Sequence, residues 1–160
     1  MFNNCRCNHP CPIFCYRLRS CTNDIVNPII TRDFGYFNNT ATQTIASSAI
    51  IPVYFVLGEG TSVVPSLSTS GAVTLAQGTY EISYFANVTI PEGGSAEIAL
   101  RLNGAVVPGS SVIATGTAGQ VVPVSQTVML SVAQSSTLEL VNVSANSIVT
   151  NLASMSIKKL

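Results

Sequence analysis

Residues 79–90, TYEISYFANVTI, carry the clearest structural signal in the chain. Along this stretch every second residue is apolar or aromatic: Tyr80, Ile82, Tyr84, Ala86, Val88 and Ile90. The intervening positions include the polar residues Glu81, Ser83, Asn87 and Thr89. A period of two places alternate side chains on opposite faces of a strand, so this pattern predicts a half-buried β-strand. Turn-forming residues at 77–78 and 91–94 bound it on both sides.

Short apolar runs separated by turn signals continue on both sides of this strand. Asn103-Gly104 predicts a hairpin turn, because both residues tolerate positive φ. Further strands are predicted at 50–57, 70–75, 98–102, 105–107, 111–114, 121–132, 137–143 and 147–158. About eight to ten strands at spacings of ~8–12 residues are typical of an antiparallel sandwich or barrel. The sequence therefore predicts an all-β domain.

The composition excludes several classes of function. The chain has 160 residues, of which 47% are apolar and only 9% are charged, and seven basic residues balance seven acidic ones. We therefore expect no nucleic-acid partner and no membrane partner, because both need a concentration of basic charge or a long apolar segment. Weak charge also leaves little repulsion between copies, which favours self-association.

The first residues differ in character from the rest of the chain. Residues 1–10, MFNNCRCNHP, are polar and lack the apolar segment of a signal peptide. We therefore expect synthesis in the cytosol and a route outward that does not use a signal peptide. The predicted organisation is a cysteine-rich N-terminal arm and connector at 1–33, followed by a β-domain at 34–160.

All five cysteines lie in the arm, at Cys5, Cys7, Cys11, Cys15 and Cys21. Because five is an odd number, pairing within one chain leaves at least one thiol, and the five are candidates for inter-subunit disulfides. Two alternatives stay open. The thiols could remain reduced in a disordered arm, or Cys7, His9, Cys11 and Cys15 could bind zinc. Their crowded spacing differs from the paired knuckles of zinc fingers, and we predict neither a metal nor a cofactor.

The connector joins the arm to the β-domain. Pro28 disfavours a helix there and biases Asn27 towards extended backbone. The apolar connector residues are predicted to dock the arm on a neighbouring copy; they are Ile25, Val26, Ile29 and Ile30. Docking would add a strand to an exposed sheet edge or exchange disulfides with the neighbour.

Catalytic chemistry finds little support in the sequence. His9 is the only histidine and lies in the arm, which is a poor place to position a general base. Glu81 and Glu97 are a conceivable carboxylate pair if their strands are neighbours. Arg101 lies on the same face as Glu97, so an ion pair is the favoured interpretation of that glutamate. We therefore expect a protein that is not an enzyme.

Two late strands provide candidate residues for a subunit interface or for the core. These residues are Val128, Leu130, Val132, Ala153, Met155 and Ile157. Alternate positions such as Met129, Val141 and Val143 are also apolar. Apolar residues on both faces of a strand indicate burial on both sides, and a subunit interface would bury the outer one.

Several stretches between Thr74 and Leu160 carry a family resemblance: LAQGTYEISYFANVTIP, ALRLNGAVVPGS and SQTVMLSVAQSSTLELVNVSANSIVTNLASMSIKKL. They resemble the C-terminal domain of the collagen-like glycoproteins of the Bacillus-type spore exosporium, which is similar to C1q and tumour-necrosis-factor jelly rolls. That resemblance implies an antiparallel jelly-roll sandwich that forms homotrimers. The chain has no Gly-X-Y repeat, so the collagen stalk is absent and the cysteine arm stands in its place.

With this arm, the chain looks similar to subunits of bacterial endospore appendages, in which an N-terminal connector docks into the neighbouring subunit. The resemblance implies a self-assembling structural subunit of a fibre on the spore surface. The chain itself is the expected partner, and an exosporium anchor protein is a further candidate partner. An alternative function is a trimeric spore-surface tip or adhesin that binds a glycan or a host protein.

Overall fold

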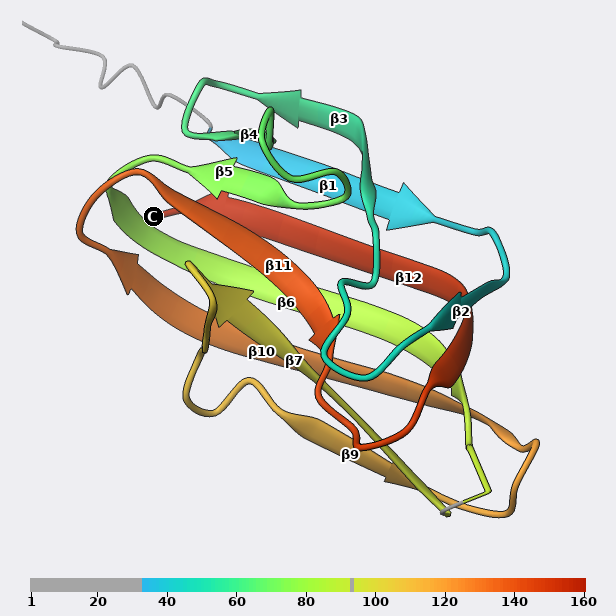
Figure 1. Ribbon diagram of the computed structural model, residues 1–160. Helices are drawn as coiled ribbons and strands as arrows, with labels where there is room; N and C mark the ends of the chain where they lie inside the picture. Colours follow the sequence, from blue (N-terminus) through green and yellow to red (C-terminus); the bar gives the residue numbers. More distant parts are fainter. Residues whose placement is uncertain (1–32, 93) are drawn as a thin grey trace, which may run out of the picture. The chain divides into compact units, whose positions relative to one another are not determined.

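The computed structural model describes residues 33–92 and 94–160. These residues form twelve β-strands and no helix (Figure 1). The strands are β1 Phe34–Asn39, β2 Gln43–Ile45, β3 Tyr54–Glu59, β4 Val63–Pro65, β5 Val73–Leu75, β6 Gly78–Thr89, β7 Ser95–Leu102, β8 Ala105–Val106, β9 Val112–Thr115, β10 Val121–Val132, β11 Ser136–Asn142 and β12 Ile148–Lys159. The prediction of an all-β domain is confirmed, and β6 is the strand that residues 79–90 predicted.

The strands form two six-stranded antiparallel sheets. Sheet A has the order β10-β6-β12-β1-β3, and β2 pairs with β12 beyond the end of β1. Sheet B has the order β4-β5-β11-β7-β8, and β9 also pairs with β7. Figure 1 shows the two sheets as two layers, with β6 and β12 in one and β7 and β11 in the other. Most neighbours within a sheet are distant in sequence, as in a jelly roll.

The core lies between the two sheets. The apolar face predicted for β6 is buried throughout, since no residue among Tyr80, Ile82, Tyr84, Ala86, Val88 and Ile90 is more than 2% exposed. Leu100 of β7 and Leu140 of β11 are also fully buried and belong to the same core cluster. Each large side chain buried in this way contributes about 1.5–3 kcal/mol relative to its exposed state.

The hairpin between β7 and β8 turns at Asn103-Gly104, as predicted. Both residues have positive φ, 48° at Asn103 and 86° at Gly104. The Asn103 side chain also ties the turn to β11, because its Nδ2 donates to Ser136 Oγ (3.0 Å) and its Oδ1 accepts from the Thr137 amide (2.8 Å). The asparagine therefore serves both the turn geometry and the packing of the hairpin on the sheet.

The single strand predicted at 50–57 is wrong, because this stretch belongs to two sheets. Ile50 bridges to Val141 of β11, and the Ile51 amide donates to the Leu140 carbonyl (2.7 Å), which places both residues beside sheet B. Residues 54–59 then form β3 in sheet A. Pro52 lies between the two parts, where its missing N–H suits a break in pairing.

Candidate assembly surfaces

The six residues predicted to line an interface or the core point to the core side of sheet A. Val132, Ala153, Met155 and Ile157 are at most 2% exposed, and Val128 and Leu130 are partly buried against the core cluster. They pack within one copy of the chain. In sheet A, it is therefore the outer face and the edges that remain for another copy.

The alternate apolar residues of these strands have different surroundings. Val141 is fully buried within a single copy, and Ile50 of the same chain bridges to it. The expectation that Val141 needs a partner subunit is therefore wrong, because its side chain is already buried within one copy. Met129, by contrast, is 62% exposed on the outer side of β10.

The outer face of sheet A has a shallow hollow of about 520 Å³. Its floor is formed mainly by hydroxyl side chains from three adjacent strands: Ser83, Ser125, Thr127, Ser154 and Ser156. Tyr36 and Phe85 also line it, and no charged residue does. Ser83 Oγ and Thr127 Oγ1 lie 2.8 Å apart and share a hydrogen bond. A neutral, hydroxyl-lined hollow can accommodate another uncharged surface or a neutral polar ligand, but it provides no acid or base.

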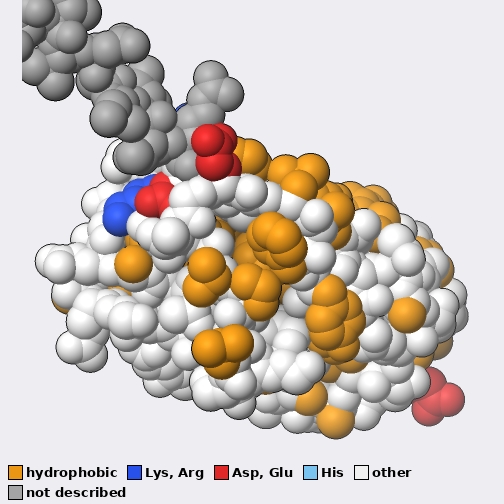
Figure 2. Space-filling view, turned by 90° about the horizontal axis from the view of Figure 1, so that it is seen from above, with side chains coloured by type: hydrophobic (Ala, Val, Ile, Leu, Met, Phe, Trp, Pro, Cys, Tyr) orange, Lys and Arg blue, Asp and Glu red, His pale blue; other side chains and the backbone are white. Residues whose placement is uncertain are grey.

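Strand β3 is the most apolar exposed element. Tyr54, Phe55, Val56 and Leu57 are consecutive and are each about half exposed, at 50%, 48%, 53% and 50%. Figure 2 looks down on the side of the molecule where β3 lies in Figure 1, and it shows apolar side chains spread over this side with few charges among them. Large exposed apolar patches mark interaction surfaces in most proteins.

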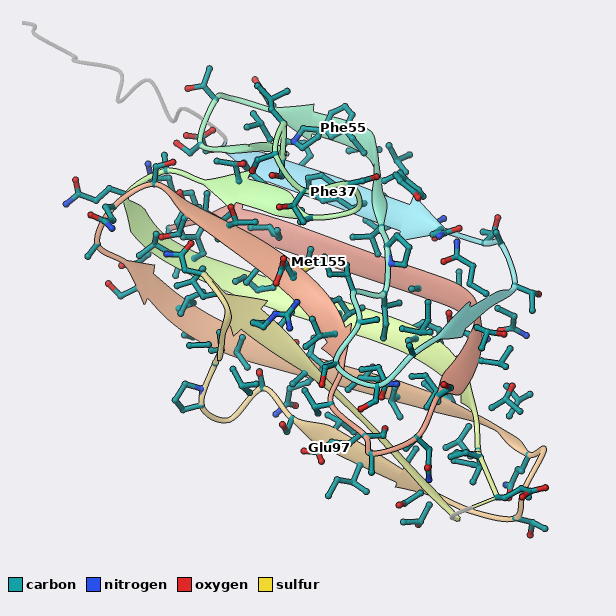
Figure 3. The ribbon with its side chains drawn as sticks, in the orientation of Figure 1. Phe37, Phe55, Glu97 and Met155 are labelled. Atoms are coloured by element: carbon teal, nitrogen blue, oxygen red, sulfur yellow. The ribbon has the colours of Figure 1, made fainter. Side chains whose placement is uncertain are left out.

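The β3 side chains are connected to the core through an aromatic pair. The ring centroids of Phe55 and Phe37 lie 5.8 Å apart in an edge-to-face arrangement, with an interplanar angle of 70°. Figure 3 shows Phe55, Phe37 and Met155 in succession from the β3 edge inward. Because Phe37 and Met155 are fully buried, Phe55 extends the core to the surface.

The acidic residues do not form the carboxylate pair considered from the sequence. Glu81 lies on β6 of sheet A and Glu97 on β7 of sheet B, so their strands are not neighbours. Arg101 pairs with Glu139, with 2.6 Å between Arg101 Nε and Glu139 Oε2, and these two residues are directly opposite in the register of β7 and β11. The prediction that Glu97 forms an ion pair with Arg101 is therefore wrong, because Arg101 pairs with Glu139 instead.

A polar cluster fixes the point at which the connector enters the domain. The Asp33 carboxylate accepts hydrogen bonds from the Ser62 amide and the Ser62 hydroxyl, and Lys159 Nζ donates to the same hydroxyl (3.0 Å). Burial acts to raise the pKa of Asp33, but the Ser62 hydrogen bonds and the Lys159 charge outweigh it and hold this pKa below its ordinary value. The first described residue is therefore bound to the turn between β3 and β4 and to the C-terminal strand.

The arm residues lie outside the described part of the chain. These are Cys5, Cys7, Cys11, Cys15, Cys21 and His9, and the docking candidates Ile25, Val26, Ile29 and Ile30. Within residues 33–92 and 94–160, no group of three His, Cys, Asp or Glu side chains could hold a metal ion. The same residues contain no helix that is long and apolar enough to cross a membrane.

Together, the sheet order and the buried faces define an antiparallel jelly-roll sandwich. Solved structures with this fold are similar to the chain over most of their length. They include the Eiger TNF of S. frugiperda (TM-score 0.63, 13% identity, 81% of this chain and 93% of that one) and the globular domain of zebrafish complement 1qA protein (0.61, 11%, 80% and 96%). Murine APRIL is a third (0.62, 10%, 81% and 99%). The fold is therefore a C1q/TNF-like jelly roll.

The sequence comparisons add no family. No protein-family model matches the chain, and no curated protein matches it either.

Sequence reasoning missed three features of the surface: the exposed edge at β3, the hollow on sheet A and the Asp33 cluster. Only the first had a signal, because the four consecutive apolar residues of YFVL do not alternate with polar ones.

Proposed function

We propose that the protein is a structural subunit that assembles with copies of itself. The observation that carries this proposal is the run of four half-exposed apolar residues on β3 of a C1q/TNF-like sheet. A free-standing domain gains nothing from such a surface, whereas a second copy would bury it. The neutral hollow on the same sheet supports the proposal, since an approaching copy meets no charge there.

The proposed unit is a homotrimer of jelly-roll bodies. Support comes from the C1q/TNF-like fold and from the outer face of sheet A, where small residues such as Ser154 and Ser156 leave room for a neighbouring surface. The arm then links one unit to the next, through the connector and through disulfides between arms. This order of assembly would produce a fibre if the links do not close into a ring.

The proposed location is the surface of a bacterial spore, in an appendage or in the exosporium. Support comes from the resemblance of residues 74–160 to exosporium glycoproteins and from the cysteine arm in place of a collagen stalk. An exosporium anchor protein is the proposed attachment partner. No catalytic role is proposed, because the described acids are scattered or, like Glu139, paired.

A second function, a trimeric tip or adhesin, has one observation in its favour. The hollow on sheet A presents five hydroxyl side chains together with Tyr36 and Phe85. Hydroxyl groups and aromatic rings are the groups that a neutral glycan contacts through hydrogen bonds and stacking. This function would require the hollow to stay open in the assembled protein.

Light scattering and negative-stain electron microscopy of the full chain test the proposal, with and without a reducing agent. We expect fibres under oxidising conditions that fall to trimers on reduction or on deletion of residues 1–21. A chain that stays monomeric under oxidising conditions, with or without the arm, contradicts the proposal. Discrete trimers under both conditions, with binding on a glycan array, would favour the adhesin.

A further inference from the structure

The two edge strands of sheet A are protected to very different extents. Strand β10 pairs only with β6, but Pro123 interrupts its hydrogen-bonding groups and its outer face carries exposed Ser125 and Thr127. Strand β3 pairs only with β1, and among the described residues nothing pairs with its other edge. Its residues 54–57 include no proline, lysine or other charge of the kind that natural edge strands use to block further pairing.

The described part of the chain begins beside this unprotected strand. Phe34, the first residue of β1, lies opposite Glu59, the last residue of β3. Asp33 is held to Ser62 in the turn that follows β3, and its carbonyl accepts from the Lys159 amide (2.8 Å). Asp33, the residue to which the connector is joined, therefore lies at the Glu59 end of β3.

We propose that connector residues 25–30 of one copy add to the free edge of β3 in the next copy as an extra strand. This inference rests on the proposed function and names the surface that receives the arm. The connector sequence IVNPII supplies four apolar side chains for the exposed side chains of β3. Main-chain hydrogen bonds provide affinity in such strand addition, and side-chain contacts provide specificity.

Pro28 determines which edge of the connector faces β3. Alternate residues of a strand direct their N–H and C=O groups to the same side, and proline has no N–H to donate. Val26, Pro28 and Ile30 therefore direct their main-chain groups away from β3, and Ile25, Asn27 and Ile29 direct theirs toward it. The proline then lies on the new outer edge, where it stops further strand addition.

The length of the chain favours a neighbouring copy over the same copy as the acceptor. To reach the far edge of its own β3, residues 31–33 would have to cross two strand spacings of about 4.8 Å each. Three fully extended residues span at most about 10 Å, which leaves nothing to pass around the turn at residues 60–62. Because residues 31–33 are so short a link, the β-domains of the two copies must also lie in direct contact when the connector is docked.

Charge favours a parallel orientation of the added strand. Glu59 is the only charged residue of β3. A parallel connector places Arg32 beyond the Glu59 end, whereas an antiparallel one places Asp24 there. In the parallel arrangement, the β-domain that supplies the connector lies head to tail with the β-domain whose β3 receives it. A head-to-tail contact that does not close into a ring forms a fibre.

Photo-cross-linking in the full chain tests this acceptor. A copy with p-benzoylphenylalanine in place of Leu57 is mixed with a ¹⁵N-labelled wild-type copy, irradiated and digested with trypsin. We expect cross-links from the segment that contains position 57 to labelled residues 20–32, the tryptic peptide that contains the connector. Cross-links confined to one chain, or joining β3 to β3 of another copy, overturn the inference.

Two pairs of variants test the register and the surface, with sedimentation velocity of the full chain as the readout. We expect Asn27→Pro to weaken association at least tenfold and Val26→Pro to weaken it much less, because only the first removes an N–H directed at β3. We expect Val56→Lys to weaken association, while Ile113→Lys, at an apolar position on β9 that is slightly more exposed (62% against 53%), leaves it unchanged. Equal effects within either pair overturn the inference.

The outcomes separate this inference from the proposed function. If association depends on the arm but residue 57 never cross-links to the connector, the acceptor lies elsewhere and only the inference fails. If the full chain remains monomeric with or without its arm, the proposed function itself fails.

Discussion

Replacement of Asn142 by alanine should destabilise the jelly-roll domain strongly, although the side chain is polar. Asn142 is fully buried at the end of β11. Its Nδ2 lies within hydrogen-bond distance of three carbonyl oxygens, those of Ile45 (3.1 Å), Ala46 (3.0 Å) and Asn146 (2.9 Å). Its Oδ1 accepts from the Ser144 amide (2.9 Å). This side chain of β11 therefore bonds main-chain groups at the end of β2 and in the turn at residues 144–146, and so joins three segments.

The size of the effect follows from the groups that lose their partner. A lost hydrogen bond costs about 1 kcal/mol net, and a buried group left without any partner costs up to about 3 kcal/mol. The two amide hydrogens and the one acceptor bond account for about three such interactions, so we expect a loss of about 3 kcal/mol. For a domain of this size, about 3–5 °C of Tm corresponds to each kcal/mol, and Tm should fall by roughly 10 °C.

Urea denaturation at one fixed protein concentration measures this loss, because association also contributes to the apparent stability. Asn151→Ala is the matched control, since Asn151 is exposed on β12, and its stability should change by no more than about 0.5 kcal/mol. Asn142→Asp should be at least as harmful as alanine, because a carboxylate cannot donate to the three carbonyls. A loss below about 1 kcal/mol for Asn142→Ala would refute the view that this residue joins the three segments.

Three further outcomes follow from the structure. Because the pKa of Asp33 is lowered in the folded state, its carboxylate stabilises the fold above the ordinary carboxyl pKa, and this stabilisation is lost as pH falls through the pKa of the folded state. In Asp33→Asn, the free energy of unfolding should therefore fall less steeply at acid pH. Burial, and then the charge of Glu97, raises the pKa of Tyr84 to about 12. The free energy of unfolding should therefore fall as pH rises from about 10 towards that value. Absorbance titration should show one phenol that ionises at this high pH in wild type and is missing in Tyr84→Phe. Phe37→Ala should lose about 3–5 kcal/mol in urea denaturation, because Phe37 is fully buried beneath Phe55.

The strands that could be predicted are those with strong local patterns. Residues 79–90 alternate over their whole length, and 121–132 matches β10 at both ends. The Asn103-Gly104 hairpin was predictable because the turn geometry depends on those two residues alone. Short strands such as β2 and β4 have only three residues each, too few to show a period.

The surfaces could not be predicted because they depend on sheet order. Ser83, Thr127 and Ser156 come together only when β6 lies between β10 and β12. The Asp33 cluster joins residues 29 and 97 positions apart in the sequence, and no local pattern relates them. The exposure of Tyr54 and Leu57 likewise reflects the place of β3 at an edge, whereas the same apolar run in a central strand would be buried.

The position of β1 in sheet A bears on how a fibre would carry tension. The arm continues directly into β1, which lies between β12 and β3 and pairs with both along its length. A pull on the arm along the strand axis must therefore break hydrogen bonds on two sides together, as well as the Asp33 bonds to Ser62. If the arm instead continued into an edge strand such as β10, the load would fall on one ladder that could open pair by pair. The arm is thus joined to a strand that is paired on both sides, and if the arm links subunits, this position resists extraction better than an edge strand would.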